Sequence, residues 1–275
     1  MQRSSVKIAH HTIAYTDFGG VGTPVLALHG SFGRGSVFTT LAAHLDGHAR
    51  IIAPDQRGHG LSDHTPTYTR DDFVNDAASL LSRLGAGPVV VLGHSSGGIT
   101  AYQLAARHPD LVSALIIEDV GPLMRTPEIP HPVLDVRDWP TTAPTREALA
   151  DAMTAHVPDS TYFMHSAVQE DDHWHLLFDW NDMMAVQEAC VGDWWPDWLA
   201  STCPALVLHG AHSPLLPPGL AEAMTVRRAD TRLVRFPDAG HWIHDDAPEA
   251  MARAIKAFLV DWRQSGGARR GSRGR

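Results

Sequence analysis

The chain has 275 residues, of which 44% are hydrophobic, which is enough apolar material for one α/β domain with an insertion or for two small domains. Its formal net charge is -9, and four arginines fall within the last eleven residues, so the rest of the chain is more acidic still. An acidic body argues against binding to nucleic acid.

Other bulk features exclude further classes. The first fourteen residues lack the continuous apolar region of a signal peptide, and no apolar run approaches membrane-spanning length. Two cysteines, Cys190 and Cys203, are too few for a disulfide framework. We therefore expect a protein of the reducing cytoplasm without a membrane partner. Residues 265–275 are rich in glycine, serine and arginine and are expected to form a disordered basic tail.

The first half of the chain alternates short apolar runs with amphipathic stretches. Residues 6–9 and 12–16 predict an opening β-hairpin. Four buried strands follow, predicted at residues 25–28, 50–53, 88–92 and 111–117. Between them, helices are predicted at residues 37–45, 70–84 and 99–107. Near-continuous apolar strands that alternate with helices indicate a parallel sheet covered on both faces.

Glycine-rich loops follow two of these strands. Residues 29–35 form a loop whose backbone N–H groups are suited to an anion nest, but no Gly-Lys-Ser/Thr closes a phosphate-binding pattern and the Rossmann spacing is absent. Residues 93–97 match G-x-S-x-G between a strand and a helix, the context of a nucleophile elbow. There the hydroxyl of Ser95 projects from a strained turn, and the N–H of Ser96 opens toward the same space.

The composition changes at residues 123–200, which carry no strand signal and are acidic, aromatic and interrupted by prolines. Helices are predicted at residues 143–156 and over much of 160–190. Such an insertion suits a helical cap over a pocket, with most of its aromatic rings packed inside the cap and two or three lining the cavity. The strand and helix rhythm then returns, predicted as strands at 204–208 and 231–236 and helices at 220–225 and 248–262. The predicted core is therefore residues 1–122 and 201–264.

One cluster in the insertion concentrates groups that can bind metals. Residues 171–175 read Asp-Asp-His-Trp-His. The two histidines have neither a helical i, i+4 spacing nor a distant third ligand in view, so the sequence predicts no metal site. No cofactor is expected either.

Four motifs in this order, at residues 29–31, 55–60, 93–97 and 240–241, resemble those of the α/β-hydrolase superfamily. The resemblance extends over about residues 6–262. It implies a mostly parallel eight-stranded sheet with a helical cap inserted after the sixth strand, and catalytic residues in the chain order Ser…Asp…His.

The resemblance also implies roles for individual residues. Ser95 is the expected nucleophile and His241 its general base, with His244, three residues further on, as the alternative base. The backbone N–H groups of Ser96 and Ser31 are the expected oxyanion hole, with Phe32 as the alternative second donor.

The triad acid departs from the usual pattern of the superfamily. Its common position, three residues after the glycine that ends the seventh strand, is occupied here by Ser213, which has no charge to stabilise an imidazolium. Either the triad is damaged or the carboxylate comes from the end of the preceding strand. There Asp119 is the preferred acid and Glu118 the alternative.

These features predict a serine hydrolase that cleaves a carboxylic ester or lactone through an acyl-enzyme. The aromatic cap favours a small molecule with an apolar acyl or alcohol group as substrate. A carbon–carbon bond hydrolase acting on a diketone remains an alternative, and so does a ligand-binding or receptor-like protein that turns over poorly. The sequence does not determine the oligomeric state.

Overall fold

The computed structural model describes residues 1–266. Eight strands form one sheet in the order β1-β2-β4-β3-β5-β6-β12-β13. The strands are β1 (Gln2–Ile8), β2 (His11–Asp17), β3 (Thr23–Leu28), β4 (Ala49–Pro54), β5 (Val89–His94), β6 (Val112–Glu118), β12 (Ala205–Gly210) and β13 (Thr231–Phe236). The β1–β2 and β2–β4 pairs are antiparallel and the others parallel, so the predicted mostly parallel sheet is confirmed.

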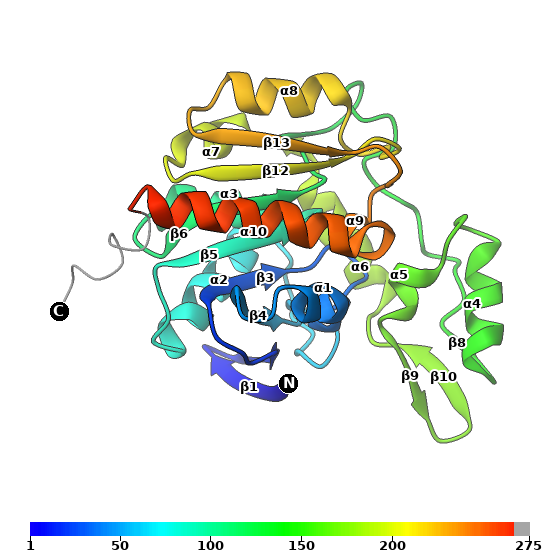
Figure 1. The fold of residues 1–275 in the computed structure, drawn as a ribbon. Helices are drawn as coiled ribbons and strands as arrows, with labels where there is room; N and C mark the ends of the chain where they lie inside the picture. Colours follow the sequence, from blue (N-terminus) through cyan, green and yellow to red (C-terminus); the bar gives the residue numbers. More distant parts are fainter. Residues whose placement is uncertain (267–275) are drawn as a thin grey trace.

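Both faces of the sheet are buried, which explains why its strands are apolar throughout. In β5, Val90 and Leu92 contribute to one hydrophobic cluster while Val89 and Val91 contribute to the other, because successive side chains of a strand point to opposite faces. Helices α1 (Thr39–His44) and α10 (Pro248–Gln264) supply the first cluster, and α10 crosses that face in Figure 1. The second cluster contains side chains of α2 (Arg70–Arg83), α3 (Ser96–Arg107) and α8 (Pro218–Val226).

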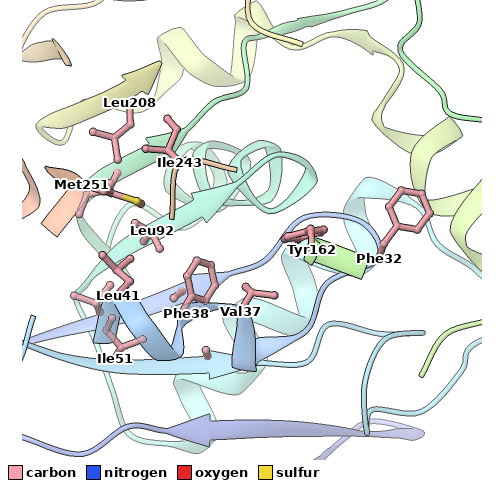
Figure 2. Packing of buried hydrophobic residues seen from close by; sticks show 14 of the residues in the cluster. Phe32, Val37, Phe38, Leu41, Ile51, Leu92, Tyr162, Leu208, Ile243 and Met251 are labelled. Atoms are coloured by element: carbon pink, nitrogen blue, oxygen red, sulfur yellow. The ribbon is translucent and has the colours of Figure 1, made fainter. Parts of the chain in front are cut away.

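The first cluster extends from the sheet toward the insertion. Figure 2 shows Leu41, Ile51 and Leu92 close together, with Phe32 and Tyr162 at the far end of the view. All five side chains are at most 7% exposed. The insertion is therefore packed onto the sheet domain through a shared apolar core.

The prediction that residues 123–200 contain no strand is wrong. Five short strands occur there: β7 (Leu123–Met124), β8 (Thr142–Ala143), β9 (Ala167–Glu170), β10 (His173–Leu176) and β11 (Gly192–Asp193). They accompany four helices: α4 (Arg146–Thr154), α5 (Thr161–Met164), α6 (Trp180–Cys190) and α7 (Trp195–Ala200). The predicted helix over 160–190 is thus interrupted by the β9–β10 hairpin. Strands of two to four residues are too short to show a clear alternation in the sequence.

Two smaller differences concern the ends of the chain and of its helices. The helix predicted at 37–45 begins as a 3-10 turn, η1 (Gly35–Phe38), and the short helix α9 (Ile243–Asp246) had no sequence signal. The predicted basic tail lies outside the described residues, except for Ser265 and Gly266. Within residues 1–266, no helix combines the length and apolar character needed to cross a membrane.

The end of β12 lies in close contact with the loop after β13. A Cβ atom on Gly210 would overlap the carbonyl oxygen of Gly240, which is backbone and has little room to move. We expect Gly210→Ala to destabilise the protein by about 1–3 kcal/mol, since added volume in a packed interior forces the backbone apart.

Gly219→Ala is the matched control, because nothing lies within 4 Å of a Cβ at that helical position. It should leave the free energy of unfolding unchanged or raise it by up to about 1 kcal/mol. Urea denaturation of both variants measures the difference. Equal stabilities would contradict the close contact at Gly210.

Candidate active site

The G-x-S-x-G motif forms the turn between β5 and α3. Ser95 has φ 52° and ψ -124°, a conformation that non-glycine residues rarely adopt. A Cβ on Gly93 would overlap the carbonyl oxygen of Gly97, and one on Gly97 would overlap that of Leu28. The two glycines therefore let the strand, the helix and β3 approach closely enough to hold Ser95 in its strained turn.

Asp119 and His241 form a buried acid–imidazole pair. The Nδ1 atom of His241 lies 2.8 Å from Oδ2 of Asp119, and the Asp119 side chain is fully buried. Asp119 directly follows β6 with φ 54°, and its Oδ1 accepts the N–H of Gly210 at 2.9 Å. Because a carboxylate only accepts, Nδ1 of His241 carries the proton and Nε2 of the neutral ring is free to accept one.

Ser95 and His241 line the same cavity, whose volume is about 790 Å³. Within residues 1–266, no hydrogen bond joins the Ser95 hydroxyl to the His241 ring in this structure. Nucleophile–base hydrogen bonds are often long in ligand-free enzymes and shorten when substrate binds. The cavity is thus lined by a hydroxyl and by an imidazole that is paired with a carboxylate, which are the kinds of group that nucleophilic catalysis uses.

The alternative acid and the alternative base bind each other. Oε1 of Glu118 accepts the backbone N–H of His244 at 2.9 Å and lies 2.7 Å from its Nδ1, and both side chains are fully buried. Burial alone would lower the pKa of His244, but the Glu118 carboxylate outweighs it and raises that pKa. The structure therefore does not bring Glu118 to His241. Ser213, at the usual acid position, accepts the N–H of Leu215 in its own loop.

The expected oxyanion residues lie beside Ser95. Ser31, Phe32 and Ser96 all line the cavity, and Ser31 Oγ lies 3.3 Å from Ser96 Oγ. Ser96 is the first residue of α3, where the N–H has no partner within the helix. Phe32 has φ 70°, and its carbonyl oxygen accepts the hydroxyl of Ser166 from the insertion at 2.7 Å.

His29 stabilises the turn that carries Ser31. Its Nε2 accepts the N–H of Gln56 at 2.9 Å, so its Nδ1 carries the proton and donates to the carbonyl oxygen of Gly30 at 2.7 Å. Burial lowers the pKa of His29 to about 4, which keeps the ring neutral and able to accept. His29, the first residue of the motif at residues 29–31, thus has a structural role here.

Tyr162, from α5 of the insertion, joins the loop after β3, which carries Ser31, to the turn that carries Ser95. The N–H of Gly30 donates to the Tyr162 hydroxyl at 3.0 Å, and that hydroxyl lies 3.4 Å from Nδ1 of His94. Nε2 of His94 donates to the carbonyl oxygen of His241 at 3.1 Å, so Nδ1 is left to accept the Tyr162 proton. Burial holds the pKa of His94 well below its ordinary value, in keeping with this single neutral form.

No sequence signal pointed to Tyr162, since it is one aromatic residue among many. Of the eight aromatics of the insertion that the sequence singled out, only Phe163 lines the cavity, fewer than expected. Trp139, Phe178 and Trp180 instead pack against one another and against Phe32. Most of the rings therefore form the shared core.

Comparisons with known proteins identify the family of this chain. The sequence model of the Alpha/beta hydrolase family matches residues 25–254. The chain is 28% identical to the sn-1-specific diacylglycerol lipase ABHD11 of Mus musculus, over 86% of this chain and 80% of that protein. It is 27% identical to Esterase YbfF of Escherichia coli, over 87% of this chain and 94% of that protein.

A solved structure is also similar throughout. The structure of E-2-(acetamidomethylene)succinate hydrolase superposes with a TM-score of 0.85 at 26% identity, covering 94% of this chain and 99% of that one. The likeness extends over the insertion as well as the sheet domain.

The bonds of Tyr162 can be tested without any substrate. Tyr162→Phe removes the hydroxyl and leaves the Gly30 N–H and His94 Nδ1 unpaired in a buried place, so we expect a loss of about 2–3 kcal/mol in the free energy of unfolding. Amide hydrogen exchange at Gly30 should become faster.

Tyr102→Phe is the control, because the Tyr102 hydroxyl is equally buried and has no hydrogen-bond partner within the described residues. Its free energy of unfolding should stay within about 0.5 kcal/mol of the wild type. Similar values for the two variants would show that the Tyr162 hydroxyl contributes nothing specific.

Proposed function

This chain belongs to the alpha/beta hydrolase family and is a hydrolase, and we propose that it cleaves a carboxylic ester or lactone with Ser95 as its nucleophile. The observation that carries the proposal is the bond between Asp119 and His241 beside the cavity that Ser95 also lines. Relatives named as an esterase and a lipase support ester chemistry.

In the proposed first half-reaction, Ser95 Oγ attacks the carbonyl carbon of the ester while its proton passes to Nε2 of His241. The Asp119 carboxylate stabilises the imidazolium that forms. The negative carbonyl oxygen is held by the N–H groups of Ser96 and Ser31, with Phe32 as the alternative second donor. Each such donor is worth roughly 3–4 kcal/mol in the transition state. His241 then protonates the leaving alcohol, and the acyl group remains on Ser95.

In the second half-reaction, water attacks the acyl-enzyme. His241 takes a proton from that water and returns it to Ser95 Oγ as the acyl–oxygen bond breaks. The products are a carboxylic acid and the free enzyme. Asp119 is the proposed triad acid because its carboxylate is anchored by the Gly210 N–H on one side and contacts His241 on the other.

Residues 123–200 are proposed to form the lid over this site, with residues 1–122 and 201–264 as the core. The support is the position of the cavity, which lies between the two parts. From the insertion it is lined by Pro130, Leu134, Val157, Phe163 and Gln187, among others. These are mainly apolar side chains, which suit an apolar acyl or alcohol group.

The charges of the cavity favour an uncharged substrate. Two carboxylates, Asp159 and Asp246, line it, and among the described residues no lysine or arginine does. A carboxylate on the substrate would therefore lose its water without gaining a cationic partner, at a cost of several kcal/mol if fully buried. We propose that the substrate has no carboxylate in the cavity, unlike the succinate derivative after which the structural neighbour is named.

Active-site variants test the assignment of the triad. A fluorophosphonate should label the wild type stoichiometrically and Ser95→Ala not at all, since only an activated serine reacts. Asp119→Asn should lower kcat for a short-chain nitrophenyl ester by roughly 10⁴, because the amide favours the wrong imidazole tautomer. Ser213→Ala should stay within about twofold of the wild type, as a residue outside the triad.

Each alternative has its own signature in this experiment. Absence of labelling in a folded sample would favour the ligand-binding function and overturn the proposal. Labelling together with cleavage of a diketone but of no ester would favour the carbon–carbon hydrolase. A large loss in Ser213→Ala with none in Asp119→Asn would remove Asp119 as the acid.

The charge argument predicts a preference among esters. For 4-nitrophenyl pentanoate we expect kcat/KM at least roughly tenfold above that for 4-nitrophenyl monosuccinate, because the carboxylate finds no cation in the cavity. Asp159→Asn should lower the ratio of the two kcat/KM values, because it removes one of the negative charges that repel the carboxylate of the monosuccinate. Asp151→Asn, an exposed acid of α4 that does not line the cavity, should leave it unchanged. Equal rates for both esters in the wild type would refute the argument.

A further inference from the structure

The β9–β10 hairpin of the insertion brings together two histidines and a glutamate. His173 and His175 are two residues apart on β10, so both side chains lie on one face of the strand. Glu170 of β9 is paired directly with His173 across the hairpin and shares that face. The sequence shows two histidines without a third ligand, and the fold supplies one.

The three side chains are close to the spacing of a metal site. One ligand atom from each residue lies within 4.8 Å of the other two. Oε2 of Glu170 is 3.7 Å from Nδ1 of His175, and the two imidazole centroids are 5.8 Å apart. In a tetrahedral site with ligands about 2.0–2.2 Å from the ion, neighbouring ligand atoms are about 3.3–3.5 Å apart. Small side-chain rotations bring the groups to that distance.

The Nδ1 atom of His175 has no hydrogen-bond partner within residues 1–266 that an ion would have to displace. It is shielded from solvent and has no hydrogen-bond partner among the described residues. A buried polar atom without a partner costs free energy, which an ion bound there would offset. A bound ion is therefore consistent with the environment of this ring.

We propose that Glu170, His173 and His175 bind one divalent transition-metal ion, with Zn²⁺ the best match. Two imidazoles and a carboxylate suit Zn²⁺, Cu²⁺ or Ni²⁺, whereas Mg²⁺ and Ca²⁺ prefer ligand sets made of oxygen. The fourth position is open to water, or to Asp172, whose Oδ1 lies 3.6 Å from Nδ1 of His173.

A second cluster with metal-binding residues does not compete well. His94, Glu118 and His244 are also close together and are fully buried. However, Glu118 is hydrogen-bonded to His244, and both nitrogens of His94 are engaged by Tyr162 and the His241 carbonyl. An ion there would have to displace the bonds that hold the active-site loops.

The ion in the hairpin would act structurally. None of its three ligands lines the cavity. It would join β9 to β10, and β10 pairs in turn with β8. Figure 1 shows the turn of this hairpin projecting from the rest of the fold. The proposed ion therefore stiffens the outer edge of the insertion without taking part in the reaction.

Calorimetric titration of the chelator-treated full-length protein with ZnCl₂ tests the site. The wild type should bind one equivalent saturably, and Glu170→Gln, His173→Ala and His175→Ala should each weaken binding by at least roughly tenfold through loss of a ligand. His10→Ala is the control, an exposed histidine at the tip of the β1–β2 hairpin, and should bind like the wild type.

Electron paramagnetic resonance with Cu²⁺ identifies the ligands directly. The wild-type spectrum should show two coordinated imidazole nitrogens, and each histidine variant should show one fewer. Absence of saturable Zn²⁺ binding by the wild type would overturn the site. Binding by all three ligand variants as tight as that of the wild type would also overturn it. Ester hydrolysis should be unchanged after treatment with a chelator, so failure of this proposal leaves the proposed function intact.

Discussion

The structure of the site depends on one buried carboxylate. Asp119 is held at the end of β6, between the backbone of β12 and the ring of His241. A buried carboxylate is costly unless its oxygens accept hydrogen bonds, and here each oxygen has a donor. Asp119 and its two partners follow three strand ends that are far apart in the sequence. The pair therefore forms only when β6, β12 and β13 lie in register. The sheet thereby fixes the position of the His241 ring, which lines the cavity.

The insertion contributes hydrogen bonds to this arrangement. The Tyr162 hydroxyl links His94, the neighbour of Ser95, to the loop that carries Ser31, and the Ser166 hydroxyl donates to the carbonyl oxygen of Phe32. The apolar cluster that contains Leu41 and Leu92 continues into the insertion. The two parts are therefore joined through polar contacts at the site as well as through the shared core.

The sheet and the elbow could be predicted because their signals are local. Buried parallel strands are continuously apolar, as at residues 88–92, and the glycines on either side of Ser95 answer a backbone contact that no larger residue allows. The preference for Asp119 over Ser213 came from the missing charge of serine and from the family resemblance, which offers a second place for the acid at the end of the preceding strand. By contrast, the pairing of Glu118 with His244 depends on α9, which is four residues long and leaves no periodic pattern. The β9–β10 hairpin was missed for the same reason, and Tyr162 matters through contacts about 70 and 130 residues away in the chain.

Glu118 and Asp119 are adjacent in the chain, yet each binds a different histidine. Neighbouring residues at a strand end project in different directions, so each acid reaches its histidine only from its own position in the sequence. Insertion of one residue before this corner would move Glu118 into the place of Asp119, and deletion of one would move Asp119 into the place of Glu118, so either change would leave one of the two histidines without its carboxylate. The number of residues is therefore constrained at this corner, and a grafted or recombined version of this fold must preserve the junction residue by residue.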